Sequence, residues 1–209
     1  MQALIFVFQL TVLIFSVMIH EIAHGVVAER FGDATARRMG RLTLNPLKHI
    51  DWYGSVLFPL FMALASGGRM VFGWAKPVPV NTANLKNPDR DTAFIAAAGP
   101  LSNFALAFVF ALFSRGLALF ADPSAYVLVL GELFSLIVIT NLSLALFNLM
   151  PIPPLDGSNI LFAFLPPSAY RARAFLEQYG FIMLIAFIAF GFPIIAPVIG
   201  WFYSVFMGA

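Results

Sequence analysis

The chain has 209 residues, of which 61% are apolar and 11% charged, and its mean hydropathy of +0.90 is too high for an ordinary soluble domain. Its net charge of +2 comes without a basic stripe, which argues against nucleic acid as a partner. The absence of cysteine excludes disulfides and thiolate metal ligands. We therefore expect a single domain embedded in the lipid bilayer over residues 1–209, in which any metal is bound by His, Asp or Glu.

Long charge-free stretches predict the membrane helices, because roughly 20 helical residues cross a hydrocarbon core. The predicted helices cover residues 2–29, 90–119, 125–149, 173–190 and 193–207. The sequence "FGFPIIAP" separates the last two, and its Gly and Pro residues favour a tight turn between two short spans. The prediction is an all-α multi-pass membrane protein with about five transmembrane helices.

The first predicted helix contains "SVMIHEIAHGVVAER", residues 16–30, which places ionisable groups deep in the membrane. Such groups are costly at that depth and are usually functional. His20 and His24 share one helix face, and imidazoles at this spacing can chelate one Zn²⁺ while Glu21 reaches a water on the metal. The alternatives are a chance match and two histidines that form hydrogen bonds between helices, which would leave Glu21 unexplained.

The segment 53–68, "YGSVLFPLFMALASGG", is shorter than a normal span and contains Pro59. If it enters and leaves on the same side, 11 of the 12 Lys and Arg residues share one side of the membrane. If it crosses, the split is six to six. The positive-inside rule favours a re-entrant or short helix. We therefore expect a cell-membrane protein with its amino terminus outside, its carboxyl terminus inside and its active site toward the cytoplasmic side.

Two short stretches predict edge strands on the cytoplasmic face, "RRMGRLTLN" at 37–45 and "GWAKPVPVN" at 73–81. An unpaired edge can bind an extended peptide by strand addition, which would suit a helical membrane segment that has to unwind before its backbone becomes accessible. Trp74, Lys76 and Pro77 are therefore candidates for substrate binding. A simple lid or interfacial anchor around Trp74 and Lys76 explains the second stretch equally well.

A catalytic zinc site needs a third protein ligand. His49, in "NPLKHIDW", fits an interfacial loop better than a deep ligand. Asp156 lies in "NLMPIPPLDGSN", residues 148–159, where prolines interrupt an apolar stretch. Irregular backbone at membrane depth occurs where it lines a cavity or is buried in protein, and a carboxylate there suits a metal. The alternative is that Asp156 caps a helix that starts near Ser158.

Three motifs in this order, "HEIAHG", "AGPLSN" at 98–103 and "NLMPIPPLDG", resemble the site-2 proteases, the zinc intramembrane metalloproteases. The resemblance implies His20, His24 and Asp156 as ligands of one zinc ion per chain. It also implies Glu21 as the general base.

The same resemblance implies that Asn148 positions the substrate or the oxyanion. It suggests substrate contact for Asn103, although an interhelical hydrogen bond is an equal alternative. The implied activity is hydrolysis of single-span membrane proteins within or near the bilayer. We expect a minimal member that lacks a PDZ or other soluble regulatory module. The alternative function is a non-proteolytic zinc-binding membrane protein that transports or senses metal, or an inactive scaffold.

Overall fold

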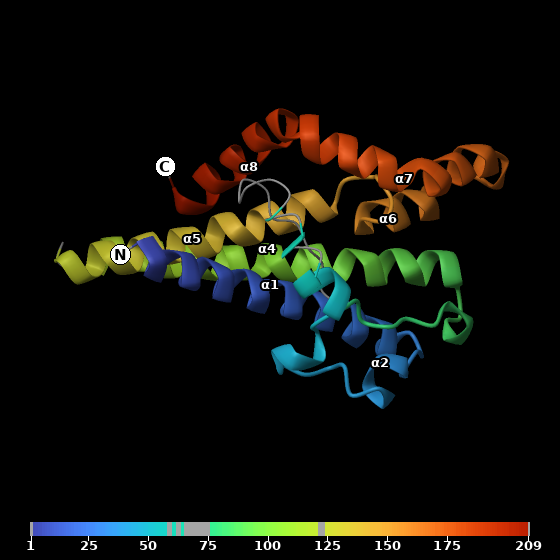
Figure 1. Ribbon diagram of the computed structural model, residues 1–209, viewed down its shortest axis with the longest axis horizontal. Coiled ribbons are helices and arrows are strands. Elements are labelled where there is room, and N and C mark those ends of the chain that lie inside the picture. The colour runs from blue at the N-terminus through green and yellow to red at the C-terminus, as the bar shows by residue number, and fades with distance from the viewer. Residues whose placement is uncertain (1, 58–59, 62–63, 65–75, 121–123, 209) are drawn as a thin grey trace.

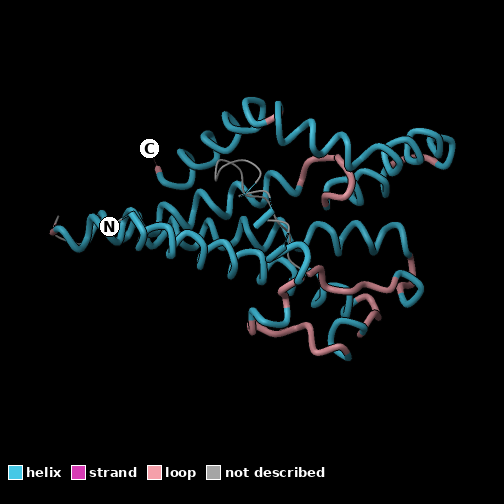
Figure 2. The backbone as a smooth tube through the Cα atoms, in the orientation of Figure 1, coloured by secondary structure: helices cyan, strands magenta, loops and turns pink. Residues whose placement is uncertain are grey.

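The computed structural model describes residues 2–57, 60–61, 64, 76–120 and 124–208. These residues form helices joined by loops, with no strand among them (Figure 2). In chain order the helices are α1 (Gln2–Arg30), α2 (Thr35–Arg38), α4 (Pro88–Phe120), α5 (Ala125–Asn148), α6 (Asp156–Phe164), α7 (Tyr170–Phe190) and α8 (Phe192–Met207). Shorter helical turns are the 3₁₀ turns Pro46–Lys48, Thr82–Asn84 and Pro167–Ala169 and the π-helical turn Trp52–Leu57.

The five predicted helices are confirmed as α1, α4, α5, α7 and α8, with bounds that differ by at most a few residues. Among the described residues, α1, α4, α5 and α7 are long and apolar enough to cross a membrane, whereas α8 is shorter. The short helices α2 and α6 were not among the predicted elements. Both lie in regions where prolines, glycines or charges break the long apolar pattern from which we predicted spans.

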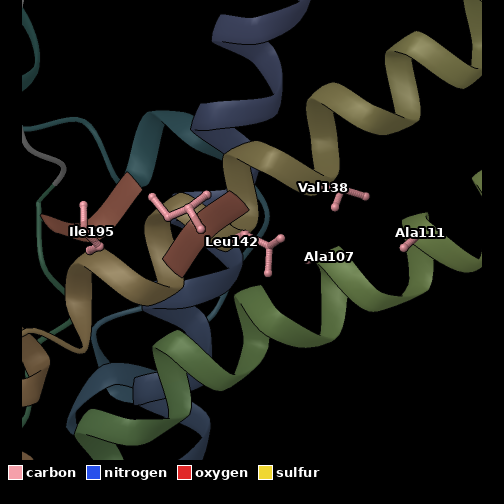
Figure 3. Close-up of a cluster of buried hydrophobic side chains, with 6 residues drawn as sticks. Ala107, Ala111, Val138, Leu142 and Ile195 are labelled. Carbon is pink, nitrogen blue, oxygen red and sulfur yellow. The ribbon is translucent and has the colours of Figure 1, made fainter. Parts of the chain in front are cut away.

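Helix α4 is the central element, because it packs against α1, α5, α6 and α8 (Figure 1). Small side chains on α4 allow α5 to approach closely, as is usual between helices in a membrane. Figure 3 shows this contact, where side chains from α4, α5 and α8 meet. The buried cluster consists of Ala107, Ala111, Val138, Leu142, Ile195 and Ile199.

Helices α7 and α8 are joined by a bend and not by the tight turn that we predicted. Gly191 between them has helical dihedral angles, φ −86° and ψ −14°. Proline in the first turn of α8 is compatible with a continuing helix, because the first turn does not need its N–H group. The chain direction is therefore kept through the bend (Figure 1).

The carboxyl terminus consequently lies at the same end of the molecule as the amino terminus (Figure 1), whereas the topology that we predicted has the two termini on opposite sides of the membrane. Ring contacts fix the direction of α8 beside α4. Phe104 contacts Phe202 at 5.4 Å between ring centroids, and Phe108 contacts Phe206 at 5.7 Å, so α8 runs parallel to α4. The 11-to-1 division of Lys and Arg residues is unaffected, because no Lys or Arg follows α7.

The predicted edge strands are not found where the structure describes the two stretches. Residues 37 and 38 complete α2, and Gly40 then turns the chain with φ +62°. Residues 76–81 are irregular and have no strand partner, while residues 73–75 lie outside the described residues. Most of the segment 53–68 beyond Leu57 also lies outside them, so its re-entrant path stays a prediction.

Asp33, just after α1, holds the loop that leads into α4. Its side chain is fully buried and accepts hydrogen bonds from the Thr35 N–H at 3.1 Å, the Asn81 N–H at 2.7 Å and the Asn84 Nδ2 at 2.7 Å. Burial alone would raise the pKa of Asp33, but these hydrogen bonds outweigh it and lower that pKa. These hydrogen bonds therefore stabilise the folded protein fully at a pH above the ordinary pKa of a carboxyl group. The stabilisation is lost as the pH falls through the lowered pKa of Asp33.

We predict that Asp33→Ala lowers the free energy of unfolding by about 3 kcal/mol, because it removes a buried carboxylate together with its hydrogen bonds to Thr35, Asn81 and Asn84. Thermal unfolding in detergent measures the effect. The matched control is Asp89→Ala, since the Asp89 side chain is 84% exposed, and its effect should stay within about 0.5 kcal/mol. Equal effects of the two substitutions would contradict the role of Asp33.

Candidate metal centre

Helix α1 presents two buried imidazoles on one face, as its i, i+4 spacing predicts. His20 is 6% and His24 9% exposed, and their rings meet edge to face at 4.6 Å. The Nε2 atoms approach one carboxylate oxygen, Asp156 Oδ2, at 3.0 Å and 3.4 Å. One ligand atom from each residue lies within 4.8 Å of the other two. The structure therefore brings together the three residues that we predicted as ligands.

The other ring nitrogens fix the tautomer of both histidines. Nδ1 of His24 lies 2.6 Å from the backbone carbonyl of Ile95, which can only accept a hydrogen bond. Nδ1 of His20 lies 2.6 Å from Oδ1 of Asn103. Each Nδ1 must carry the proton and donate it, so each Nε2 presents a lone pair toward Asp156. This is the arrangement that orients histidine for a metal.

Asp156 reaches this point because the loop after α5 turns back, so that α6 begins close to Leu149 at the end of α5. It is the first residue of α6, and the N-cap is Leu155, without a side-chain capping bond. The alternative that Asp156 caps a helix is therefore wrong. Gly157 permits the close approach, since a Cβ on it would lie 2.1 Å from the Leu149 carbonyl oxygen. No larger residue fits there without moving the loop.

The side chains of His20, His24 and Asp156 fit a bound cation better than they fit hydrogen bonds to one another. Two imidazole lone pairs and a carboxylate oxygen face one another, and Asp156 Oδ2 is buried without a hydrogen-bond donor. Gly99 on α4 leaves space beside them, because a Cβ there would lie 2.5 Å from Nε2 of both His20 and His24. Two imidazoles, one carboxylate and an open position form the usual donor set of a catalytic zinc.

Asn103 lies behind His20, and the prediction that it contacts substrate is not supported. It is fully buried, and its amide is used completely. Oδ1 accepts from His20, while Nδ2 donates to the Ser16 carbonyl at 3.3 Å and to Asn141 Oδ1 at 2.9 Å. The alternative that we kept for this residue, an interhelical hydrogen bond, is confirmed.

Glu21 is half-buried beside the two histidines, and its carboxylate contacts the loop before α4. Oε2 accepts a hydrogen bond from the Val78 N–H at 2.8 Å. Val78 is 7% exposed and packs over Gly25, where a Cβ would lie 2.9 Å from Val78 Cγ1. The loop at Val78 is thereby held against the side of α1 that carries Glu21 and Gly25, next to the face with the two histidines.

The remaining predicted site residues have other contacts where the structure describes them. Asn148 is the last residue of α5, and its Nδ2 donates to the Leu144 carbonyl at 2.9 Å. Lys76 and Pro77 are exposed, and their carbonyls accept from Nη2 of the buried Arg41 at 2.7 Å and 3.2 Å. Trp74 lies outside the described residues.

Three residues around the centre were not predicted from the sequence, namely Gly99, Val78 and Asn141, which contact His20, Glu21 and Asn103 respectively. Gly99 lies in the quoted motif "AGPLSN", but the motif alone does not show that the two histidine rings pack against Gly99. Val78 acts through its backbone N–H, which carries no signal in its side chain. Asn141 is a polar residue within the apolar span α5, and this depth is the signal that could have identified it.

Comparison with known proteins gives a consistent result. A model of peptidase family M50 matches residues 8–125 and 116–187. "Putative zinc metalloprotease YwhC" from Bacillus subtilis is 41% identical over 178 residues, which cover 83% of this chain and 76% of that protein. "Putative zinc metalloprotease Rip2" from Mycolicibacterium smegmatis is 32% identical over 191 residues, which cover 90% of this chain and 67% of that protein. No solved structure matches the chain.

We predict that Gly99→Ala weakens zinc binding roughly 10- to 100-fold, because the new methyl group displaces Nε2 of both histidines. Zinc affinity is measured by competition with a chelator on the purified protein in detergent. Gly116→Ala on the same helix is the matched control, since a Cβ there meets nothing within 4 Å. Unchanged affinity in Gly99→Ala would show that the metal lies elsewhere.

Proposed function

Because the chain belongs to peptidase family M50, the site-2 protease family, we propose that it hydrolyses peptide bonds of single-span membrane proteins within or near the bilayer. The observation that carries this proposal is the convergence of His20, His24 and Asp156 beside Glu21. The three ligands would hold one zinc ion. Bound zinc would lower the pKa of water and polarise the scissile carbonyl.

Glu21 is the proposed general base. It follows His20 directly on α1, and its Oε2 already accepts the Val78 N–H. We therefore assign proton transfer to Oε1, which takes a proton from the attacking water and later delivers it to the nitrogen of the leaving amine. The Val78 hydrogen bond keeps the carboxylate turned toward the loop, which limits the rotation that Oε1 would otherwise have.

Asn148 is the proposed donor to the oxyanion. A carboxamide has two N–H groups, and the hydrogen bond to the Leu144 carbonyl uses one of them. The second can stabilise negative charge that develops on the scissile carbonyl oxygen. Its position at the end of α5, just before the loop that leads to Asp156, favours this role.

We place the substrate path along Lys76 and Pro77. Both are exposed, and Arg41 fixes their backbone beside the residue that contacts Glu21. A transmembrane substrate must unwind before its peptide carbonyl becomes accessible, because a helix uses its backbone groups internally. The extended loop offers a surface along which an unwound segment can lie next to the proposed base.

We predict that Glu21→Gln abolishes cleavage while zinc content stays near one per chain, because the amide keeps the side-chain shape but cannot accept a proton. Loss of a general base typically reduces the rate ~10²- to 10⁴-fold. His20→Ala, His24→Ala and Asp156→Ala should instead lose zinc and activity together. The measurements are cleavage of a single-span substrate in liposomes and elemental analysis of each variant.

Cleavage by Glu21→Gln at near the wild-type rate, with contaminating proteases excluded, would refute the assignment of the base. Zinc binding without cleavage of any single-span substrate by the wild-type protein would favour the alternative of a non-proteolytic zinc protein.

A topology test follows from the charge distribution and the bend at Gly191. We predict that cysteines at Lys86 and at Tyr126 react from opposite sides, Lys86→Cys from the cytoplasm and Tyr126→Cys from outside. A cysteine added after Ala209 should react from outside. Labelling by an impermeant thiol reagent is clean because the chain has no native cysteine. Reaction of the carboxyl-terminal probe from the cytoplasm alone would contradict a single bent crossing by α7 and α8.

A further inference from the structure

We propose that Asn141 is a positioning residue for the zinc site, which acts through Asn103 to keep the lone pair of His20 Nε2 free for the metal. This inference rests on the proposed zinc-dependent function and extends it to a buried residue of α5. Asn141 lies on α5, is fully buried, and forms its hydrogen bonds with Asn103 and the Ile137 carbonyl and not with a metal ligand. Its effect must therefore pass through the residue that it binds.

Three residues form a chain of hydrogen bonds from α5 to α1. Asn141 Nδ2 donates to the Ile137 carbonyl at 2.9 Å, which leaves its Oδ1 facing α4. That Oδ1 accepts from Asn103 Nδ2 at 2.9 Å, and Asn103 Oδ1 in turn faces His20 Nδ1 at 2.6 Å. Each amide is oriented by a backbone carbonyl or by the preceding amide in the chain.

The orientation of the Asn103 amide determines which nitrogen of His20 carries the proton. With Oδ1 toward the ring, Nδ1 must be protonated and Nε2 is free. If the amide turned over, its N–H group would face Nδ1, which would then have to accept. The proton would move to Nε2, the atom that faces Asp156 and the metal.

Asn141 supplies the stronger of the two acceptors that prevent this rotation. The other acceptor, the Ser16 carbonyl, lies 3.3 Å from Asn103 Nδ2, compared with 2.9 Å for Asn141 Oδ1. Both asparagines are fully buried within membrane-spanning helices, where water cannot replace a lost acceptor. Residues that orient metal-bound histidines usually contribute 10- to 100-fold to metal affinity.

The test is a double-mutant cycle of zinc affinity on the full chain in detergent, measured by competition with a chelator. We expect Asn141→Ala to weaken zinc binding roughly tenfold and Asn103→Ala to weaken it by more. The double variant should be no weaker than Asn103→Ala, because Asn141 then has nothing left to orient. Additive losses, or unchanged affinity in Asn141→Ala, would overturn the proposal.

Two further variants separate the proposed role from general stability. Asn141→Asp keeps the shape, and as a neutral acid its O–H can donate to the Ile137 carbonyl while its other oxygen accepts from Asn103, so its zinc affinity should stay within about threefold of wild type. Thr140→Val is the matched control on the same helix, because it removes an equivalent bond to the Leu136 carbonyl, 2.7 Å long, without touching Asn103. If Asn141→Asp loses as much affinity as Asn141→Ala, the acceptor is not responsible.

A spectroscopic measurement does not depend on zinc or cleavage. In metal-free, ¹⁵N-histidine-labelled protein at a pH where the imidazoles are neutral, we expect His20 to carry its proton on Nδ1. Asn141→Ala should add a population with the proton on Nε2, while the His24 signal stays unchanged because Ile95 holds its Nδ1. An unchanged His20 signal in this variant would overturn the proposal even if zinc binding and cleavage by the wild-type protein are as we propose.

Discussion

The buried imidazoles of α1 need acceptors for their Nδ1 protons, and α4 supplies both of them. Ile95 provides a backbone carbonyl and Asn103 a side-chain oxygen. In a hydrocarbon environment an unpaired polar group costs several kcal/mol, so these bonds fix how α1 and α4 lie relative to each other. The same two bonds leave the Nε2 atoms pointing to one place. The hydrogen bonds that hold α1 against α4 are therefore the same bonds that orient the two histidines.

Helix α4 meets this requirement with a sequence of small and polar residues. Gly99 leaves the space into which both Nε2 atoms point, and Ala107 and Ala111 further along allow close contact with α5. Helix α6 lies against α4 and carries Asp156. Each ligand is therefore positioned against the same helix, although α4 itself supplies no ligand. Substitutions on α4 are therefore expected to change the positions of His20, His24 and Asp156 without removing any of them.

The sequence was sufficient to predict the five longest helices and the three residues that meet at the candidate site, because apolar length and short motifs are local properties. It was not sufficient for the bend at Gly191, since Gly and Pro are compatible with a turn and with a continuing helix alike. Asn103 shows a different limit. Its burial depends on α1 and α5, which come from distant parts of the chain, so substrate contact and an interhelical bond could not be separated. The Val78 contact with Glu21 uses a backbone N–H, which no residue pattern reveals.

The division of the ligands between α1 and α6 has a consequence for biosynthesis. Translation delivers the amino-terminal helix first, so His20 and His24 enter the membrane long before Asp156 has been synthesised. Through this interval α4 can already bind both Nδ1 atoms, but the site lacks its carboxylate. The nascent protein would thus hold only a two-imidazole site, and a tightly bound metal has to wait until the loop after α5 folds back. Assembly order itself would then keep an incomplete protease inactive while it is still attached to the ribosome.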